Sequence, residues 1–319
     1  MRSGFDRLTE ILVYDPTDAP RYAELIRAPR GRVDVRVAST PEEAAKHIAT
    51  TEVLYGWKPP VELYARAERL RWLHAMGAGV DWALVPELPK RVVITRSPGV
   101  FGPWMAEYVL AWCLWVTQHV AAYREAQARR EWIQDRPPER LAGKTIAIIG
   151  LGDIGRTVAR AARQIGLRVI GITRSGRPVS GVERVYRSRD LRRALAVADF
   201  AVLVVPLNAT TRGMIGAAAL AAMRPSAWLI NIGRGALIDE SALVHALQNR
   251  TIAGAVLDVF TTEPLPLDHP LWSLDNAVIT PHISGPNLPE EIAPVFNDNL
   301  ARYLAGRPLR HVVDRRRGY

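Results

Sequence analysis

The sequence predicts an α/β protein with two doubly wound domains, each built on a parallel β-sheet that helices cover on both faces. Short apolar runs alternate with helical stretches along the whole chain, as expected when crossover helices join parallel strands. Several runs, such as Thr145–Ile149, are apolar at consecutive positions, which is typical of strands buried on both faces. The length of 319 residues accommodates two domains of about 150 residues each.

The first α/β series ends near Pro98-Gly99. Residues 11–14 form a short apolar run, and residues 33–37 alternate apolar and polar side chains with the period of a strand. Thr40 followed by Pro41 has the composition of a capped helix start. The other strands predicted in this series are residues 53–56, 70–75 and 92–95.

A long helix is predicted over residues 103–130, and its first part is apolar on most faces. A helix of this kind is normally buried, between domains or between subunits. We therefore expect a homodimer. A second α/β series starts at Lys144, and a last helix is predicted near residues 289–304. The strands predicted in the second series are residues 145–149, 168–173, 200–205, 228–232, 253–257 and 278–280.

The net charge of +10 does not by itself indicate a nucleic-acid partner. Nearly all of the 42 basic residues are arginine, and they are spread along the chain apart from residues 124–140 and 315–317. Nucleic-acid binding needs clustered charge, so we expect a solvated basic surface and no nucleic-acid partner. The positive electrostatic field of such a surface can help to attract anionic ligands.

The sequence predicts neither a secretory signal nor a membrane span. Residues 1–10 contain four charged side chains and no apolar run, and no stretch approaches ~18 consecutive apolar residues. The one cysteine, Cys113, cannot form an intrachain disulfide, which is usual in the reducing cytoplasm. We therefore expect a cytoplasmic protein, without membrane association and without a metal site.

A glycine-rich turn follows the first strand of the second series. Gly150, Gly152 and Gly155 fit the pattern G-x-G-x-x-G, and the residues after them open a helix. The first glycine permits a tight turn, the second lets the backbone approach a pyrophosphate, and the third allows close helix–strand packing. Asp153 and Ile154 lie at the start of the helix, where free N–H groups attract phosphate. The sequence thus predicts a Rossmann-like dinucleotide-binding domain.

The end of the next strand favours NADP over NAD. A site that prefers NAD usually has an acidic residue about 20 residues after the motif, where it binds the ribose hydroxyls. This chain has Thr173, Arg174 and Ser175 there, and no carboxylate before Glu183. The two hydroxyls can donate to a 2′-phosphate, and the guanidinium can pair with it. We therefore expect NADP (NADPH) as the cofactor, with NAD as the alternative.

Three later segments each place a functional side chain just after a strand, where ligands bind in open α/β sheets. These segments are residues 231–240, 257–265 and 280–285, and shorter motifs precede them at residues 143–145, 205–207 and 211–213. Together, in this order, the motifs resemble the D-isomer-specific 2-hydroxyacid dehydrogenase family over most of the chain. The Thr173-Arg174-Ser175 turn resembles the NADPH-dependent glyoxylate/hydroxypyruvate reductase branch of this family.

The resemblance implies Arg234, Glu263 and His282 as the catalytic set. Reduction of a 2-oxo acid needs a hydride at the carbonyl carbon and a proton for the oxygen, and a histidine can supply that proton near neutral pH. Glu263 would orient the ring and stabilise its charged form. Arg234 would bind the substrate carboxylate and polarise the carbonyl. Each residue type alone is more often structural, but the three in this order indicate a dehydrogenase.

The same resemblance implies a substrate pocket with contributions from both halves of the chain. Trp57, Ala78 and Gly79 would line it together with Arg234 and His282. The backbone N–H groups of the glycine-rich turn would hold the substrate carboxylate, as concave arrangements of N–H groups do.

Further cofactor contacts follow from the resemblance. Asp258 would contact the nicotinamide amide group or, as the alternative, cap the turn that follows it. The other implied cofactor contacts are Val205, Pro206, Thr211, Ile232, Gly233, Arg234, His282 and Gly285.

We therefore predict a discontinuous, flavodoxin-like substrate domain of residues 1–102 and 284–319, with a dinucleotide-binding domain of residues 103–283 inserted into it. The expected reaction is reduction of a small 2-oxo acid of the glyoxylate or hydroxypyruvate type to a D-2-hydroxy acid, with His282 as proton donor. The alternatives on the same fold are a short-form phosphoglycerate dehydrogenase, a phosphite dehydrogenase and a nucleotide-binding corepressor. A corepressor would have extended tails, of which this chain has hardly any.

Overall fold

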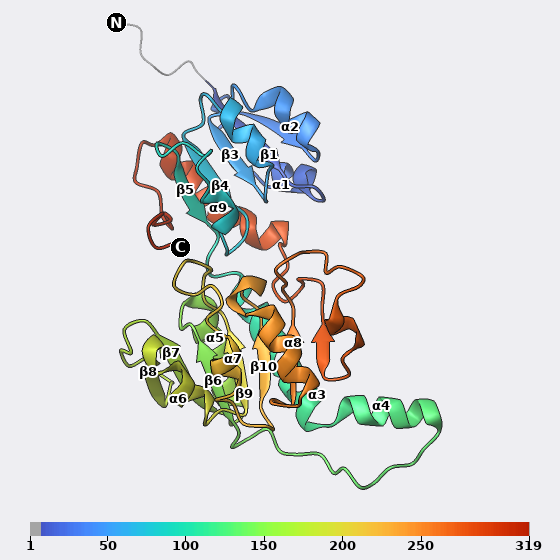
Figure 1. Cartoon of the computed structure of the whole chain (residues 1–319). Helices are drawn as coiled ribbons and strands as arrows, with labels where there is room; N and C mark the ends of the chain where they lie inside the picture. The colour runs from blue at the N-terminus through green and yellow to red at the C-terminus, as the bar shows by residue number, and fades with distance from the viewer. Residues whose placement is uncertain (1–7, 319) are drawn as a thin grey trace, which may run out of the picture. The chain divides into compact units, whose positions relative to one another are not determined.

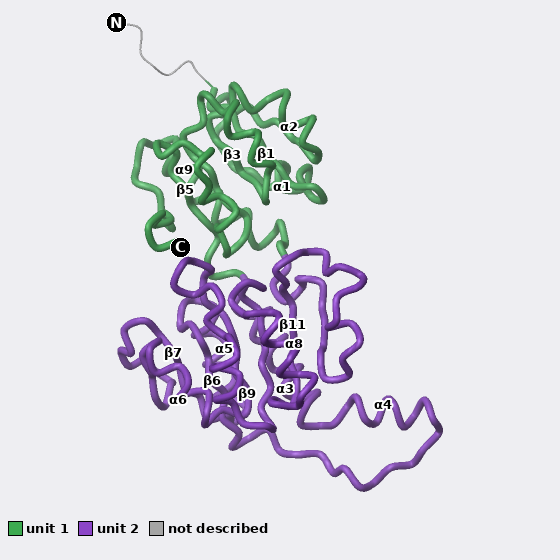
Figure 2. Tube along the Cα trace, in the orientation of Figure 1, with its two compact units in different colours: residues 1–100, 287–319 green, residues 101–286 purple. Residues whose placement is uncertain are grey.

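The computed structural model describes residues 8–318 of the chain. The chain forms two compact units, unit 1 (Met1–Val100 and Asn287–Tyr319) and unit 2 (Phe101–Pro286) (Figure 2). Each unit is built on one parallel sheet, so the predicted fold class is confirmed. The division of the chain falls close to the predicted boundaries at 102 and 284.

Unit 1 has a five-stranded sheet in the order β2-β1-β3-β4-β5 (Figure 1). β1 (Thr9–Tyr14) lies between β2 (Val33–Ala38) and β3 (Val53–Gly56), where the strand order reverses. This order is the flavodoxin-like one, in which ligands bind beyond the carboxyl ends of the strands. The other elements are α1 (Ala19–Glu24), α2 (Pro41–His47), η1 (Val61–Arg66), β4 (Trp72–Ala75), η2 (Asp81–Ala83), β5 (Val93–Arg96) and α9 (Pro289–Leu304).

The C-terminal helix α9 belongs to the core of unit 1. Its Phe296 is fully buried and stacks on Tyr55, with 4.0 Å between ring centroids, and on Trp72 at 5.2 Å. Burial of large aromatic side chains dominates core stability. The last helix therefore completes a domain whose strands all come from the first hundred residues.

A buried chain of hydrogen bonds joins the ends of β4 and β5. Trp72 Nε1 donates to Thr95 Oγ1 (2.7 Å), and the Thr95 hydroxyl donates to His74 Nδ1 (2.7 Å). His74 Nε2 donates to Ser97 Oγ (3.0 Å), which donates to the carbonyl of Ala75 (3.4 Å). This assignment uses each hydroxyl proton once and needs a neutral imidazole. Burial lowers the pKa of His74 to about 3, in agreement with a neutral ring.

Unit 2 has a seven-stranded sheet in the order β12-β11-β10-β9-β6-β7-β8. β6 (Thr145–Ile149) is buried throughout and lies between β7 and β9, where the order reverses. This is the Rossmann strand order with a further strand at one edge. The other elements are α3 (Phe101–Thr117), α4 (Val120–Arg129), α5 (Asp153–Gln164), β7 (Arg168–Thr173), β8 (Arg184–Arg187), η3 (Ser188–Asp190), α6 (Leu191–Leu195), β9 (Phe200–Leu203), α7 (Ala217–Leu220), β10 (Trp228–Asn231), η4 (Gly235–Leu237), α8 (Glu240–Gln248), β11 (Gly254–Leu257), η5 (Pro270–Ser273) and β12 (Ala277–Ile279).

The prediction of one helix over residues 103–130 was wrong, because the chain forms α3 and α4 with a break between them. His119 adopts a left-handed conformation with φ of 50°, which ends α3. The carbonyl of Thr117 accepts a hydrogen bond from the N–H of Glu139 (2.7 Å) instead of continuing the helix. α4 and the segment after it extend away from the sheet (Figure 1).

Although α3 is apolar on most faces, it is not buried on all of them. Its buried face includes Met105, Val109 and Cys113, whereas Trp104 is 40% exposed and Leu114 is 44% exposed. Burial raises the pKa of the Cys113 thiol well above its usual range, so the thiol stays protonated. The exposed face of α3 is the feature on which the expected homodimer depends.

Within residues 8–318, no helix has both the length and the apolar composition needed to cross a membrane. The same residues contain no group of His, Cys, Asp or Glu side chains that could hold a metal ion.

Candidate active site

The turn between β6 and α5 has the close approaches that its glycines predict. Gly150 has φ of 107°, and a Cβ there would lie 2.6 Å from the carbonyl oxygen of Val204. A Cβ at Gly155 would lie 1.9 Å from the carbonyl oxygen of Gly150, so the helix can pack on the turn only without a side chain. A Cβ at Gly152 would meet no atom within 4 Å. Gly150 and Gly155 therefore pack tightly against the protein backbone, whereas Gly152, at the start of α5, leaves free space. A dinucleotide diphosphate fits this space.

The loop after β9 lies beside this turn. Val205 approaches Gly150, because a Cβ on that glycine would lie 2.8 Å from Val205 Cγ1. Thr211 Oγ1 donates to the carbonyl of Pro206 (2.7 Å), which closes the loop on itself. These predicted cofactor residues therefore meet where the strand order reverses, the place at which open α/β sheets bind ligands.

The turn after β7 is ordered by its own hydroxyl groups. Thr173 Oγ1 accepts a hydrogen bond from the N–H of Gly176 (3.0 Å), and Ser175 Oγ accepts one from Arg177 (3.3 Å). Both hydroxyls act as acceptors in these bonds, so their own protons can be donated to a ligand. The side chain of Arg174 is exposed.

The three predicted catalytic side chains follow three neighbouring strands that end in register. Asn231 of β10 pairs with Leu257 of β11, which pairs with Ile279 of β12. The loops after these strands carry Arg234, Glu263 and His282, respectively. The residues therefore share one edge of the sheet in unit 2, although they are far apart in the sequence.

The loop that carries Arg234 is fixed by Asn231 and by its contact with the next loop. Asn231 Nδ2 donates to the carbonyl of Arg234 (2.9 Å), and the N–H of Gly233 donates to Asn231 Oδ1 (3.1 Å). A Cβ at Gly235 would lie 1.9 Å from the carbonyl carbon of Phe260, in the loop that leads to Glu263. The loops of Arg234 and Glu263 are therefore in direct contact. Ile232, at the start of the Arg234 loop, is buried.

Glu263 and His282 form a hydrogen-bonded pair. His282 Nδ1 and Glu263 Oε2 are 2.8 Å apart, and each side chain is 30% exposed. Glu263 Oε1 accepts a second hydrogen bond from the N–H of Phe260 (3.0 Å), which fixes the carboxylate. With Nδ1 directed at Glu263, Nε2 is the ring nitrogen that remains for proton exchange with a ligand.

Asp258 holds the loop that carries His282. Its carboxylate accepts hydrogen bonds from the Thr280 hydroxyl (2.6 Å) and from the backbone N–H groups of Ile283 (2.8 Å) and Ser284 (2.9 Å). The residue is fully buried, and its carboxylate is occupied by these three donors. Asp258 therefore caps the turn that follows it, which was one of its two predicted roles, and its contact with the nicotinamide stays a prediction. Gly285, the last predicted cofactor residue, packs against Met105 of α3.

Three supporting residues were not singled out from the sequence. Tyr108 of α3 donates to Thr280 Oγ1 (2.7 Å), since the Thr280 proton goes to Asp258, and burial raises the pKa of this phenol above its usual range. Glu240 accepts hydrogen bonds from the N–H of Thr261 (3.3 Å) and from His269 Nε2 (2.9 Å), which ties down the loop before Glu263. Asn231 is the third. Asn231 ends a strand and lies two residues before a glycine, and this position is the one signal in the sequence that indicates a turn-supporting side chain.

The predicted substrate residues of unit 1 form a second group. Gly56 of β3 pairs with Ala75 of β4, so the segments that follow them lie at the same edge of the sheet. The indole of Trp57 packs on Gly77, where a Cβ would lie 2.1 Å from Trp57 Cζ3. Trp82 Nε1 donates to the carbonyl of Gly79 (3.2 Å). Ala78 is half-buried in the same turn.

The comparison with known families identifies the chain. Residues 110–284 match the family model described as D-isomer specific 2-hydroxyacid dehydrogenase, NAD binding domain. This match spans more than half of the chain, and the protein belongs to the D-isomer specific 2-hydroxyacid dehydrogenase family. The predicted family is confirmed, and unit 2 contains its NAD-binding domain.

Relatives and solved structures agree with this assignment. Glyoxylate/hydroxypyruvate reductase A of Serratia proteamaculans (strain 568) is 34% identical over 272 residues, which cover 82% of this chain and 86% of the relative. The NADPH-dependent glyoxylate/hydroxypyruvate reductase of Sinorhizobium meliloti, solved with NADP and sulfate, has a TM-score of 0.89 at 30% identity and covers 98% of this chain and 100% of its own. A D-isomer specific 2-hydroxyacid dehydrogenase of Xanthobacter autotrophicus Py2, solved with NADPH and MES, has a TM-score of 0.86 at 33% identity, with coverage of 98% and 100%.

Proposed function

We propose that the protein reduces a small 2-oxo acid of the glyoxylate or hydroxypyruvate type to the D-2-hydroxy acid, with NADPH as its preferred cofactor. The observation that carries the proposal is the 2.8 Å pair of His282 and Glu263, on the sheet edge that also carries Arg234. The relatives named glyoxylate/hydroxypyruvate reductase support the substrate class.

The three side chains divide the chemistry among them. Bound NADPH supplies the hydride that the carbonyl carbon accepts. His282 Nε2 donates a proton to the carbonyl oxygen, so the carbon–oxygen double bond becomes an alcohol. Glu263 stabilises the imidazolium before the transfer and keeps Nε2 directed away from itself. Arg234 pairs with the substrate carboxylate and polarises the adjacent carbonyl.

We assign cofactor binding to unit 2, where Arg234 and His282 would also contact the substrate. The diphosphate would be held by the accessible backbone of Gly152 and by the first turn of α5, which contains Asp153 and Ile154. The turn at Thr173, Arg174 and Ser175 would hold the 2′-phosphate, because it offers two hydroxyls and an exposed guanidinium. Trp57, Ala78 and Gly79 would line the substrate pocket.

A turnover assay tests the proposed function. Glyoxylate, hydroxypyruvate, pyruvate and bulkier 2-oxo acids are each supplied with NADPH or NADH, and oxidation of the dinucleotide is followed by absorbance. We expect glyoxylate or hydroxypyruvate with NADPH to give the highest kcat/KM, and hydroxypyruvate to yield D-glycerate in chiral chromatography. If no 2-oxo acid oxidises either dinucleotide, the proposal fails and the nucleotide-binding regulatory alternative replaces it.

We also propose a homodimer formed through α3, α4 and the segment after them. Trp104 and Leu114 of α3 are exposed in the single chain, and Trp132, just beyond α4, is 90% exposed. Among residues 103–138, these are the large apolar side chains that the structure leaves exposed, and exposed apolar surface marks interaction sites. The location in the cytoplasm remains a prediction from the single cysteine.

A further inference from the structure

Arg187 lies beside the turn that would bind the 2′-phosphate, although it is far from that turn in the sequence. β7 and β8 are parallel, and their register pairs Thr173 with Arg187 at the carboxyl ends of the two strands. A Cβ at Gly176 would lie 2.6 Å from Arg187 Cγ. The stem of the arginine therefore packs against the glycine of the turn, and the strand register sets its backbone beside Thr173.

The turn itself is preorganised against this stem. Gly176 has φ of 66°, and its N–H donates to Thr173 Oγ1 (3.0 Å). A side chain at position 176 would be strained in this conformation and would displace Arg187. The glycine thus permits the approach of a second arginine, through its aliphatic stem, to the turn that already carries Arg174.

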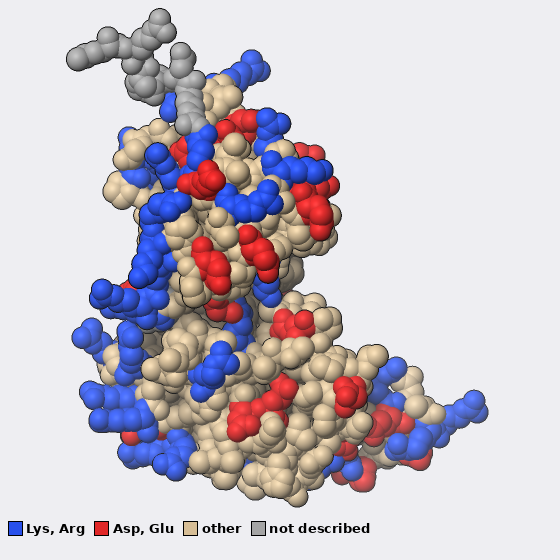
Figure 3. All heavy atoms as spheres, turned by 45° about the horizontal axis from the view of Figure 1, so that its top comes forward, with Lys and Arg blue, Asp and Glu red and all other residues tan. Residues whose placement is uncertain are grey.

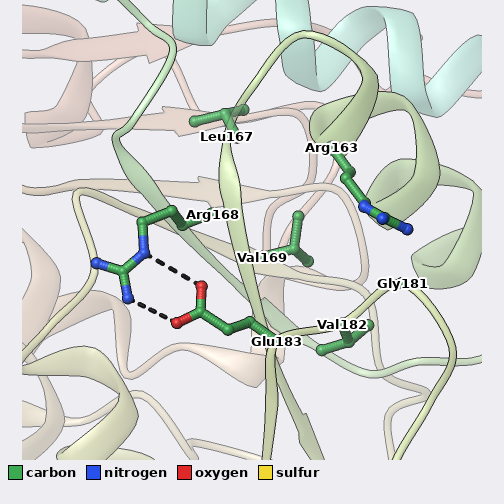
Figure 4. Close-up of a pocket in the computed structure, with 7 residues that line it drawn as sticks. All are labelled: Arg163, Leu167, Arg168, Val169, Gly181, Val182 and Glu183. Atoms are coloured by element: carbon green, nitrogen blue, oxygen red, sulfur yellow. Dashed lines mark hydrogen bonds and ion pairs between the residues drawn. The ribbon is translucent and has the colours of Figure 1, made fainter.

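The charges along β7 and β8 differ between the two ends of the strands. At the amino end, Arg168 forms a two-pronged ion pair with Glu183 (2.6 Å and 3.1 Å), beside a pocket of about 390 Å³ (Figure 4). Arg184 lies over the ring of Tyr186, 4.6 Å from its centroid. At the carboxyl end, no ion pair within residues 8–318 joins Arg174 or Arg187 to a carboxylate. At the amino end Arg168 is therefore paired with a carboxylate, whereas among the described residues no carboxylate pairs with Arg174 or Arg187 at the carboxyl end.

The surrounding surface adds to the positive charge at the carboxyl ends of β7 and β8. Ten arginines and only two carboxylates lie between residues 160 and 193. Basic side chains gather on the side of unit 2 that carries β7, β8 and α6 (Figure 3). A 2′-phosphate carries a dianionic charge that suits two guanidinium groups better than one.

We propose that Arg187 is a specificity-determining residue, which pairs with the 2′-phosphate of NADP. It would do so from the end of β8, the strand next to β7, after which Arg174 lies. The phosphate would lie between the two arginines and accept hydrogen bonds from the hydroxyls of Thr173 and Ser175. This inference rests on the proposed use of NADPH and adds to it a residue contributed by β8.

Binding of two nucleotide fragments tests the inference without turnover. Titration calorimetry measures the affinity of the full chain for adenosine 2′,5′-bisphosphate and for AMP, which lacks the 2′-phosphate. Arg187→Gln should weaken binding of the bisphosphate by about tenfold or more, as expected for a lost charge-assisted hydrogen bond, and leave AMP binding unchanged. Arg184→Gln is the matched control, because it removes an exposed arginine from the same strand at its other end.

The outcomes separate this inference from the proposed function. If the wild-type chain binds both fragments equally, the NADPH preference itself is wrong. If Arg174→Gln weakens bisphosphate binding and Arg187→Gln does not, the NADPH preference stands and the role of Arg187 is refuted. An equal loss in Arg184→Gln and Arg187→Gln would also refute it, because the effect would then come from net charge alone.

Discussion

His282 has a left-handed backbone conformation, with φ of 54°, at the residue whose ring meets Glu263. A side chain in this region costs about 1–3 kcal/mol and persists only where the surroundings enforce it. Here the N–H of His282 donates to the carbonyl of Asp258 (2.9 Å), and the ring is held by Glu263. The backbone and the ring are thus fixed independently, which preorganises Nε2 for the proton transfer that we propose.

Replacement of His282 tests this role directly. His282→Asn should lower kcat by about 10²–10⁴-fold, because the transition state loses its general acid. Binding of NADPH, followed by its fluorescence, should persist. His245→Asn is the matched control, since His245 lies exposed on α8. The activity of this variant should equal that of the wild type. Near-normal turnover in His282→Asn would remove this residue from the mechanism.

At the level of secondary-structure elements, the loop after β12 depends on Asp258 at the end of β11. One carboxylate accepts three hydrogen bonds from this loop, and Tyr108 of α3 supports one of the donors. Three elements therefore converge on the segment that positions His282. In the proposed mechanism Asp258 would act through His282, as a positioning residue.

Asp258→Asn should separate positioning from general stability. The amide can accept at one oxygen only, so at least one backbone N–H loses its partner and the free energy of unfolding falls by about 1–3 kcal/mol. Well below the unfolding temperature, kcat should still fall while the dissociation constant for NADPH is unchanged. Tyr108→Phe, which removes only the outermost donor, should show a smaller effect of the same kind. A kcat that merely follows the folded fraction would contradict the positioning role.

The elements show which features the sequence could predict. The glycine turn and the buried strands were predictable because local spacing and apolar runs encode them. β8 was missed because it is an edge strand without a buried residue, so it has no apolar run. The break at His119 was missed because no glycine or proline marks it. Arg187 could not be connected to Thr173 from spacing, because strand register and not sequence distance brings them together.

At the scale of the whole molecule, the buried imidazole of His74 links the stability of unit 1 to pH. Burial lowers its pKa to about 3, whereas the unfolded chain has the ordinary value near 6.5. Between these values the unfolded state takes up a proton that the folded state does not. The free energy of unfolding is therefore highest above that window and falls as the pH is lowered through it.

His74→Gln should flatten this dependence. Chemical denaturation at several pH values between about 6.5 and 5 limits the contribution of carboxylates, whose ordinary pKa values lie lower. The wild-type chain should lose up to about 1.4 kcal/mol per pH unit more than the variant. The readout is the difference in slope, so a general loss of stability in the variant does not affect it. Equal slopes would show that His74 does not set the acid sensitivity.

The assembly of the molecule is tested at the exposed face of α3. Leu114→Glu places a charge on the proposed dimer surface and should raise the dimer dissociation constant by about tenfold or more, because association would bury that charge. Leu267→Glu is the matched control, since Leu267 is also exposed but lies beyond β11, outside the proposed surface. Sedimentation velocity over a range of concentrations measures both variants beside the wild type. A wild-type chain that sediments as a monomer, or a Leu114→Glu variant that dimerises as well as Leu267→Glu, would place the subunit contact elsewhere or remove it.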